Sequence, residues 1–453
     1  MKAIYLMILC LTSFLIAGCG GNESEDRSLA NEAIELYNKG KYREAKDSML
    51  RAYAAFERLE VKDKAKRINY LRWLCKISNT LQESKKTIEY AKEVKVLALT
   101  DDDRGFAYSY IGLAYLYKGE YDKAIENHKK SLSIQLKKLG AEHPDVGRSH
   151  SNIGLAYLYK GEYDRAIGYF EKYLAISLKK LGAEHPDLGT TYNNIGESYR
   201  SKGEYDKAIG YFEKGLAISL KALGAEHPEV GKIYNNIGLT YDNKGKYDKA
   251  IGYFERCLAI SLKALGAEHP EVGTFYGNIG LAYSNKDEYD KAIEFHEKSL
   301  AIYLKKLGPE HPDLGFPYNN IALAYLNKGE YDRAIGYSEK ALAIFLKNLG
   351  SRHPVVGTTY NNMGAMYDNK GEYDKAIEYY EKDLAISLKV LGAEHPDVGT
   401  TYLNIGSTYA SKGDKTKAMA YFLKAKTIYL QKLGVQHPNT KEVQSWIDVI
   451  NNE

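Results

Sequence analysis

Eight histidines, each followed by a proline, are the residues of this chain whose type and spacing first suggest chemistry. They recur every 42 residues, at His143, His185, His227, His269, His311, His353, His395 and His437. Imidazole is the commonest protein ligand for metals. However, equivalent positions in stacked helical repeats lie on the order of 10 Å apart, whereas the ligands of one zinc ion lie about 2 Å from it. We therefore predict a structural role for these histidines in a turn, no metal site and no cofactor.

Residues for nucleophilic or acid-base catalysis do not stand out from the rest of the sequence. The chain has no Gly-x-Ser-x-Gly motif, no glycine-rich phosphate loop, and no pair of acidic residues set apart from the repeating pattern. We expect Cys75 and Cys257 to be buried small apolar residues, with dimerisation through an exposed one as the alternative. The sequence thus predicts no catalytic residue, and we expect that the protein is not an enzyme.

Another cysteine, Cys19, follows Gly18 after an apolar N-terminal run over residues 3–17. This run is shorter than the ~20 residues of a membrane-spanning helix and is typical of a secretory signal. Ile16-Ala17-Gly18-Cys19 resembles the bacterial lipobox, which implies cleavage before Cys19 and lipidation of that residue. We predict a lipoprotein signal peptide over 1–18, a tether over 19–27, and a membrane anchor in the bacterial cell envelope. The outer membrane is the default, at its periplasmic face or the cell surface. The alternative is an ordinary signal peptide with an incidental cysteine.

The charges of the chain are balanced and interleaved. Sixty-three Lys and Arg face 59 Asp and Glu, for a formal net charge of +4, and there is no block of like charge. This pattern argues against a dedicated nucleic-acid binder.

The 453 residues are too many for one core, and the 41 Tyr and 40 Gly indicate one unit copied many times.

The 42-residue spacing defines eight units over 105–440, of which 189–230 is the reference copy. Its first apolar stripe has the i, i+3, i+4, i+7 spacing of an amphipathic helix: Tyr192, Ile195, Gly196 and Tyr199. After a turn at Gly203 a second stripe runs from Ala208 to Leu223. Pro228 then suits the first position of the next helix. Each unit is therefore predicted to be an antiparallel helix pair.

These residues resemble the tetratricopeptide-repeat pattern, with tyrosine where tryptophan is common. The unit has 42 residues instead of 34, and its Leu-Gly-Ala-Glu-His-Pro connector is similar to the kinesin-light-chain type of repeat. The resemblance implies an all-α, right-handed superhelical solenoid of antiparallel helix pairs. Residues 28–104 are predicted to be two diverged pairs that cap the N-terminal end, and 441–453 to be a C-terminal capping helix.

The face of the first helix opposite its apolar stripe carries the candidate binding residues. At 100° per residue, Thr190, Asn194, Glu197 and Ser201 point away from the core. The resemblance implies that this face lines a concave groove that binds extended peptides or partner segments. Seven consecutive units carry asparagine at one position, where a carboxamide can both donate to and accept from a peptide backbone: Asn152, Asn194, Asn236, Asn278, Asn320, Asn362 and Asn404. The alternatives are a neutral relic of duplication, or a bridge between neighbouring helices.

Positions that differ between copies are the candidates for ligand selectivity. They are Phe106, Tyr110, Leu113, Tyr117, Arg148, Leu155, Glu197, Arg200 and Lys232. The first two units are the apolar ones, so an apolar anchor of the ligand is expected there. The rival account is that the diverged N-terminal copies fold over that patch.

The leading hypothesis is a lipid-anchored envelope scaffold that binds peptide segments or partner proteins in the groove. A surface-exposed adhesin or host-interaction lipoprotein is one alternative, and a regulatory subunit of an envelope enzyme complex is another. The sequence gives neither the ligand nor the oligomeric state.

Overall fold

The computed structural model describes residues 25–59 and 63–452. The predicted signal peptide, Cys19 and most of the predicted tether lie outside these residues. The described chain contains 21 α-helices, one short 3₁₀ helix and no strand, which confirms the all-α class and the array of antiparallel helix pairs. The chain divides into two compact units, Met1–Ala225 and Glu226–Glu453, and each is described by itself.

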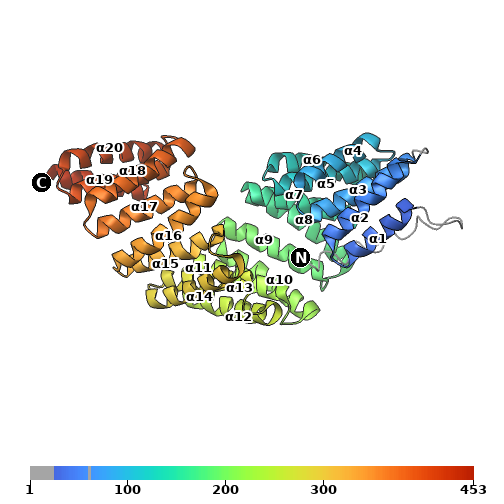
Figure 1. Cartoon of the computed structure of the whole chain (residues 1–453), viewed down its shortest axis with the longest axis horizontal. Helices are drawn as coiled ribbons and strands as arrows, with labels where there is room; N and C mark the ends of the chain where they lie inside the picture. Colours follow the sequence, from blue (N-terminus) through green and yellow to red (C-terminus); the bar gives the residue numbers. More distant parts are fainter. Residues whose placement is uncertain (1–24, 60–62, 453) are drawn as a thin grey trace. The chain divides into compact units, whose positions relative to one another are not determined.

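In its described residues the first unit is made of the helices α1 to α10, which Figure 1 labels. They are α1 (Glu25–Asn38), α2 (Tyr42–Glu57), α3 (Lys64–Thr80), α4 (Ser84–Leu97), α5 (Asp101–Tyr117), α6 (Tyr121–Leu139), α7 (Pro144–Lys160), α8 (Tyr163–Leu181), α9 (Pro186–Ser201) and α10 (Tyr205–Leu223).

The second unit continues the same alternation. Its helices are α11 (Pro228–Asn243), α12 (Tyr247–Leu265), α13 (Pro270–Asn285), α14 (Tyr289–Leu307), η2 (Pro312–Leu314), α15 (Gly315–Asn327), α16 (Tyr331–Leu349), α17 (Pro354–Asn369), α18 (Tyr373–Val390), α19 (Pro396–Ser411), α20 (Lys415–Lys432) and α21 (Pro438–Asn452).

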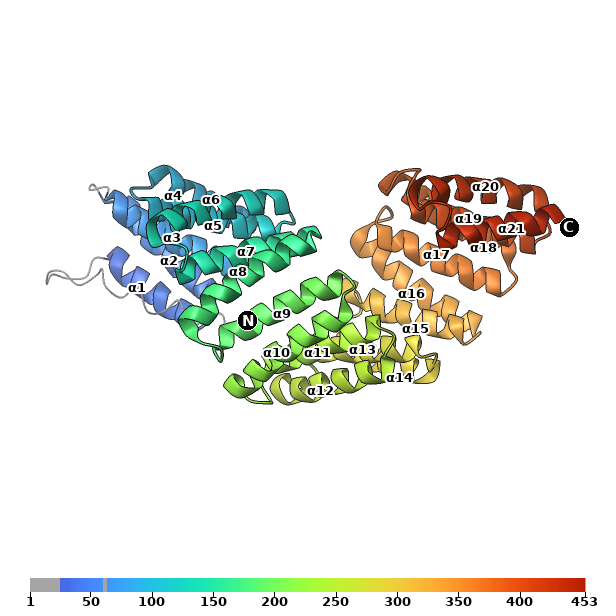
Figure 2. The same cartoon turned by 180° about the vertical axis from the view of Figure 1, so that it is seen from behind.

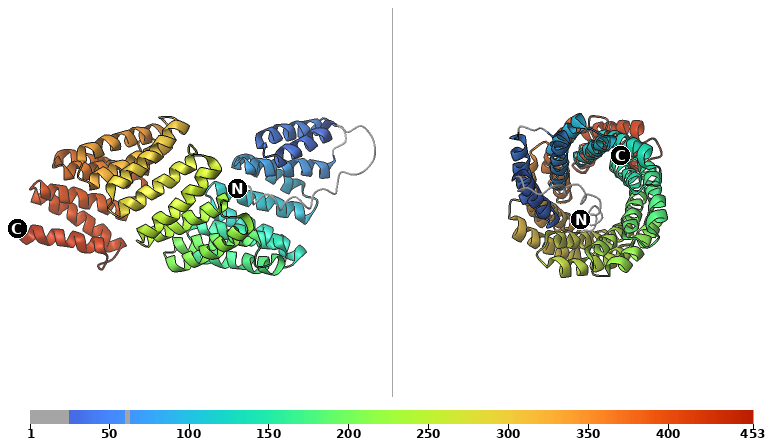
Figure 3. Two further views of the ribbon diagram at one scale, coloured as in Figure 1. Left: turned by 90° about the horizontal axis from the view of Figure 1, so that it is seen from below. Right: turned by 90° about the vertical axis from the view of Figure 1, so that its right-hand side faces the viewer.

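Odd-numbered helices are the first helices of the pairs, and even-numbered helices are the second helices. From α1 to α19 each first helix packs against its own second helix. Within a unit, each first helix that follows another pair, α21 included, also packs against the second helix of that pair. Within each unit, consecutive helices lie side by side in chain order, as Figure 2 shows from behind and Figure 3 from below. A first helix is therefore held between two second helices, with one side left uncovered.

The His-Pro sequence starts the first helices in a specific way. In all eight copies the histidine is the N-cap residue, and its Nδ1 accepts the backbone N–H two residues further on at 3.1–3.3 Å. Proline follows at the first helical position, where its missing N–H leaves no bond unmade. The predicted structural role of the histidines in a turn is thus confirmed, and it is the role of a helix cap.

Two glycines of the repeat have separate physical reasons. A Cβ added at Gly196 would lie 2.7 Å from the ring of Phe212, so only glycine lets the two helices of this pair approach so closely. Gly203, in the turn between the helices, has a φ of +82°, a left-handed conformation that most residues avoid. Asp287 occupies the equivalent turn position two repeats later with a φ of +63°.

Among the first helices that follow a His-Pro sequence, one starts differently, through η2 and then α15. Pro317 is the third residue of α15, and a proline has no N–H with which to bond the carbonyl four residues earlier. The first turn, over Pro312–Leu314, is accordingly a 3₁₀ helix. The rest of this first helix keeps the position of its counterparts.

Ion pairs link successive helix pairs at their turns. Lys202, for example, lies 2.7 Å from Asp164 of the preceding pair and 2.7 Å from Glu204 of its own turn. Lys328 bridges Asp290 and Glu330 in the same way. The hydrogen bond to Asp164, followed by that to Glu204, raises the pKa of Lys202. Most turn lysines are therefore already engaged by carboxylates.

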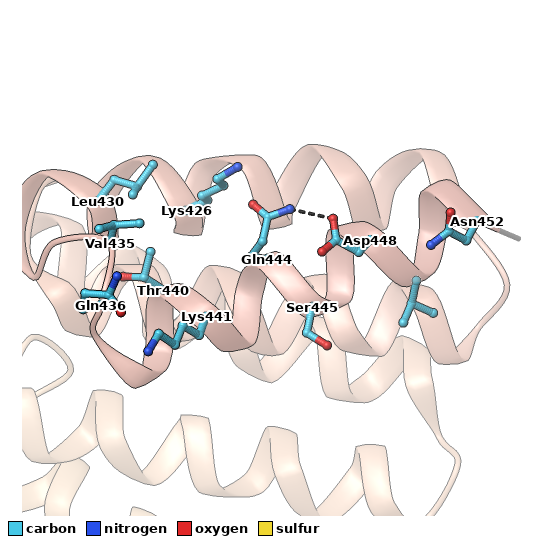
Figure 4. A pocket seen from close by; sticks show the side chains of 11 residues that line it. Lys426, Leu430, Val435, Gln436, Thr440, Lys441, Gln444, Ser445, Asp448 and Asn452 are labelled. Carbon is cyan, nitrogen blue, oxygen red and sulfur yellow. Dashed lines mark hydrogen bonds between the residues drawn. The ribbon is translucent and has the colours of Figure 1, made fainter.

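The last helix, α21, has the features of a terminal cap. In the preceding repeat the second helix packs against Gly399 and Gly406 of the first helix. The equivalent residues of α21 are Lys441 and Asp448. Figure 4 shows Asp448 accepting a hydrogen bond from Gln444, at 2.7 Å, on the outer side of α21. Val443 and Ile447 bury the opposite side against α20. The two positions at which a second helix packs in other repeats are thus charged in α21, as expected of a terminal repeat.

The N-terminal helix α1 begins at Glu25, so residues 25–27 of the predicted tether are helical. Asp26 is buried, with 2% of its surface exposed. Its carboxylate accepts a hydrogen bond from the Tyr70 hydroxyl at 2.8 Å and pairs with Lys66 at 2.5 Å. These contacts attach the start of α1 to α3.

Candidate partner-binding face

The first helices present a continuous uncovered side in each unit, here called the open face. In the first unit, α5, α7 and α9 contact one another in succession, and in the second unit α11, α13, α15, α17 and α19 do the same. The open face is formed by the residues at the repeat positions of Thr190, Asn193, Asn194, Glu197, Arg200 and Ser201. Apolar side chains are exposed on it in the second unit, with Leu281 at 42% and Phe316 at 53%. The open face therefore carries apolar side chains beside polar ones.

All seven asparagines of the predicted row are partly exposed, so their amides are not turned into the core. Three of them bond to the asparagine that precedes the row position in the previous repeat. Asn278 donates to Asn235 at 2.9 Å, Asn362 to Asn319 at 3.3 Å and Asn404 to Asn361 at 3.3 Å. The predicted alternative of a bridge between neighbouring first helices is thus confirmed for these three residues. Each bridge occupies one N–H and leaves the amide oxygen and the second N–H for another partner.

A buried carboxylate orients the amides at one of these bridges. Asp383 of α18, 5% exposed, accepts hydrogen bonds from the Asn361 side chain at 2.9 Å, the Thr401 hydroxyl at 2.7 Å and the Ser387 hydroxyl at 3.0 Å. Because a carboxylate only accepts, Asn361 must direct its N–H groups to Asp383 and its oxygen to Asn404. Asn404 is then left with its own oxygen free on the open face. Sequence reasoning missed Asp383, since no other repeat carries an acid at its position.

A second row of asparagines lies seven residues after the first, which is about 10 Å along each helix. It consists of Asn243, Asn285, Asn327 and Asn369, all exposed. Asn285 donates to both carboxylate oxygens of Asp242 in the preceding first helix, at 3.2 Å each. Sequence reasoning missed this row, although its 42-residue spacing was the signal that could have found it. The open face of the second unit thus carries two parallel rows of amides.

The predicted aromatic residues at the start of the open face differ in exposure. The Phe106 ring lies under the Arg72 guanidinium, 4.5 Å away, and 4.4 Å from the Tyr110 ring. Both rings pack against the core formed with the N-terminal helices, as the rival account expects for them. Tyr117, in contrast, is 54% exposed, and Leu113 and Leu155 are partly exposed. The apolar surface of the first unit's open face therefore centres on α5 and α7 beyond Tyr110.

The charged residues predicted to set selectivity are paired within their own helices. Arg148 pairs with Asp145, and the Arg200 guanidinium contacts both oxygens of Glu197, with Nε 3.0 Å from Oε2. In the second unit, Lys232 lies 2.7 Å from Glu229. The charges of these three cations are thus partly neutralised before any ligand arrives.

Two histidines stand in the core where other repeats have phenylalanine. His128 and His296 are fully buried at the position of Phe170, Phe212 and Phe254, and neither ring nitrogen of either residue has a hydrogen-bond partner. Burial lowers the pKa of each imidazole to about 4. Both rings are therefore neutral at physiological pH, and neither faces the open side.

Other groups with reactive side chains lie in the core or are dispersed. Cys75 and Cys257 are free and buried, as predicted; burial raises the pKa of Cys75, and that of Cys257 to about 12. Within residues 25–59 and 63–452, no three His, Cys, Asp or Glu side chains are close enough to hold a metal ion. No helix of that part of the chain is both long and apolar enough to cross a bilayer.

Comparison with known protein families gives one match. The family described as tetratricopeptide repeat matches the segments 103–179, 163–221, 187–263, 229–305, 271–347, 313–387 and 355–431. Together these segments cover residues 103–431 and include every asparagine of the predicted row. No curated protein is significantly similar to the chain.

Solved structures with similar folds are numerous. Nearly identical TPR-like repeats, described as a kinesin light chain of Podosopora anserina, are 28% identical over 46% of this chain and 98% of that chain, with a TM-score of 0.41. The apo form of RapI is 16% identical over 81% of this chain and 98% of its own, with a TM-score of 0.59. A Rap protein complexed with Competence and Sporulation Factor is 15% identical over the same shares, with a TM-score of 0.50. The two Rap proteins share the fold alone.

Proposed function

Because the chain belongs to the tetratricopeptide-repeat family, which matches residues 103–431, we propose that it is a non-catalytic scaffold that binds segments of partner proteins on its open face. The likeness of the repeat to that of kinesin light chains supports this role, and so does the fold shared with the Rap proteins. The Rap protein complexed with Competence and Sporulation Factor is an array of similar fold that holds a partner.

The observation that carries the proposal is the register of the amides. Within the described residues, Asn278, Asn362 and Asn404 each donate one N–H to the neighbouring first helix, and the carboxamide oxygen accepts no hydrogen bond. Such groups can pair with the backbone N–H and C=O of an extended segment whatever its side chains are. Leu281 and Phe316 supply exposed apolar surface beside them.

The proposal is tested by affinity capture with matched variants. The chain from residue 20 onward is immobilised and exposed to solubilised cell-envelope proteins, and bound proteins are identified by mass spectrometry. The test variant changes Asn278, Asn320 and Asn362 to Ala. The control variant changes Glu255, Glu297 and Glu339 to Ala, three exposed residues of the second helices.

We expect proteins that bind the unmodified chain and the glutamate variant to be lost from the asparagine variant, with circular dichroism showing that all three are folded. Retention of the same proteins by the asparagine variant would remove the amide row from the mechanism. Loss with the glutamate variant instead would move binding to the second helices.

We further propose that Cys19 carries the lipid that anchors the scaffold in the bacterial cell envelope. The support is the match of residues 16–19 to the lipobox after an apolar run. Metabolic labelling with an alkyne fatty acid should label the full chain and not its Cys19→Ser variant; equal labelling would refute the anchor. Protease treatment of intact cells then separates the two sides, because degradation indicates the cell surface and protection indicates the periplasm.

A further inference from the structure

The open face of the second unit carries few charges, and only some of them are paired with an opposite charge. At its positions in α11, α13, α15, α17 and α19 the charged side chains are Lys232, Asp242 and Asp368. Lys232 is paired with Glu229 at 2.7 Å. Asp242 and Asp368 form no ion pair within the described chain. The unpaired charge of this face therefore consists of two carboxylates.

Asp242 and Asp368 occupy the same repeat position, three repeats apart, and each is partly buried. Asp242 accepts from the Asn285 amide at 3.2 Å with both oxygens. Asp368 has less support: its Oδ1 is buried and without a hydrogen-bond partner in the described structure, and a contact with the Thr408 hydroxyl lowers its pKa less than burial raises it. The residue that corresponds to Asn285 in the repeat after Asp368 is Ser411, a side chain too short to repeat the contact. Burial raises the pKa of both aspartates.

Lysines near both aspartates are engaged by other carboxylates. Lys286, at the turn after Asp242, lies 2.7 Å from Asp248 and 2.6 Å from Glu288. Lys370, two residues after Asp368, lies 2.8 Å from Asp332 and 2.7 Å from Glu372. Lys412 at the next turn pairs with Asp374. A partly desolvated carboxylate without a counter-ion is costly, and a cation that approaches from outside the chain relieves that cost.

We propose that the open face of the second unit selects partner segments that carry basic side chains, with Asp242 and Asp368 as the carboxylates that receive a lysine or arginine. This inference rests on the proposed function and adds the chemical class of the partner. The uncharged amides of both asparagine rows hold the segment, and the aspartates discriminate among segments. Opposite charge adds affinity and fixes register, whereas an acidic segment meets two unneutralised carboxylates and is excluded.

The test uses three fluorescein-labelled peptides of twelve residues with the same Leu, Ser and Gly content. The peptides differ at two positions, which are both Lys in the first peptide, both Gln in the second and both Glu in the third. Binding to the chain from residue 20 onward is measured by fluorescence anisotropy at 150 mM salt. The variants are Asp368→Asn, Asp242→Asn and both together, and Glu339→Gln on a second helix is the matched control. Because Asp368→Asn removes a charge that has no counter-ion, the variant should fold at least as well as the unmodified chain.

We expect the Lys peptide to bind at least about tenfold more tightly than the Gln peptide, as for a charge-assisted hydrogen bond, and the Glu peptide to bind most weakly. The double aspartate variant should bind Lys and Gln peptides alike, and Glu339→Gln should keep the full preference. Equal binding of the three peptides to the unmodified chain, absence of binding by all three, or a Lys preference that survives in the double variant would overturn the proposal. The proposed function is decided separately by the asparagine variant in the capture experiment, so a failure of the charge preference can be told apart from a failure of the proposed function.

Discussion

Replacing His128 and His296 by phenylalanine should stabilise the protein and remove part of its sensitivity to acid. Each imidazole is fully buried, and neither of its nitrogens has a partner. An unsatisfied buried polar group costs about 1–3 kcal/mol, so each substitution is expected to gain about that amount at pH 8. Phenylalanine fits the site, because Phe212 and Phe254 occupy it in other repeats over the same glycine position.

The acid sensitivity follows from the pKa of the two buried imidazoles. Burial lowers each pKa from 6.5 in the unfolded chain to about 4 in the folded one. The stability that depends on neutral imidazole is therefore present above pH 6.5 and is lost as the pH falls toward 4. The loss at pH 5 is about 2 kcal/mol per histidine, and it approaches about 3.4 kcal/mol below pH 4.

The assay is urea unfolding followed by circular dichroism at pH 8 and pH 5, for the unmodified chain, His128→Phe, His296→Phe and the double variant. The eight histidine caps are present in every protein, so their effects cancel in the comparison. The unmodified chain should lose more free energy of unfolding between the two pH values than the double variant, by about 4 kcal/mol. An equal loss in both proteins would refute the reasoning that these imidazoles are buried and neutral.

Three further predictions concern stability and are checked by the same unfolding measurement. Gly238→Ala should lower the free energy of unfolding by about 1–3 kcal/mol, because the new Cβ would lie 2.6 Å from the Phe254 ring. Gly252→Ala, with open space around it, should raise it by about 0.5–1 kcal/mol. Equal effects of the two substitutions would contradict the packing argument. Asp287→Gly should gain about 1 kcal/mol because Asp287 has a φ of +63°, and a loss would mean that its contact with Tyr289 matters more. His353→Ala should lower the free energy of unfolding by about 1 kcal/mol, because the helix loses its cap. His353→Asp should recover most of that loss, because aspartate also caps helices. If it does not, the ring has another role.

Much of the fold follows from the repeat itself. The 42-residue spacing, the apolar stripes and Pro228 predict the helix pairs and the start of α11 at that proline. These features are local in sequence, and each is repeated eight times, so the pattern is evident without knowledge of tertiary contacts. The turn role of the histidines followed from the same spacing, but the accepting Nδ1 depends on the rotamer and is visible only in the structure.

The parts that sequence reasoning missed depend on contacts between repeats. Whether an asparagine such as Asn278 bridges to the preceding helix depends on which residue faces it, here Asn235. Asp383 is a single departure from the repeat, and its role depends on Asn361 and Thr401, which are distant in sequence. The acid at Asp368 recurs only at Asp242, and the missing partner of its Oδ1 is visible only in the structure. The packing of Phe106 against Arg72 depends on the diverged N-terminal helices, whose pattern is too faint to give a register.

Partner binding on the open face can be observed by site-specific photo-crosslinking in cells. A photoreactive phenylalanine analogue placed at Leu281, on the open face of α13, is compared with one at Ala259, an exposed position of the second helix α12. If partners bind on the open face, a crosslinked partner protein should form from position 281 and none from position 259. A crosslink from position 259 with none from position 281 would contradict binding on the open face.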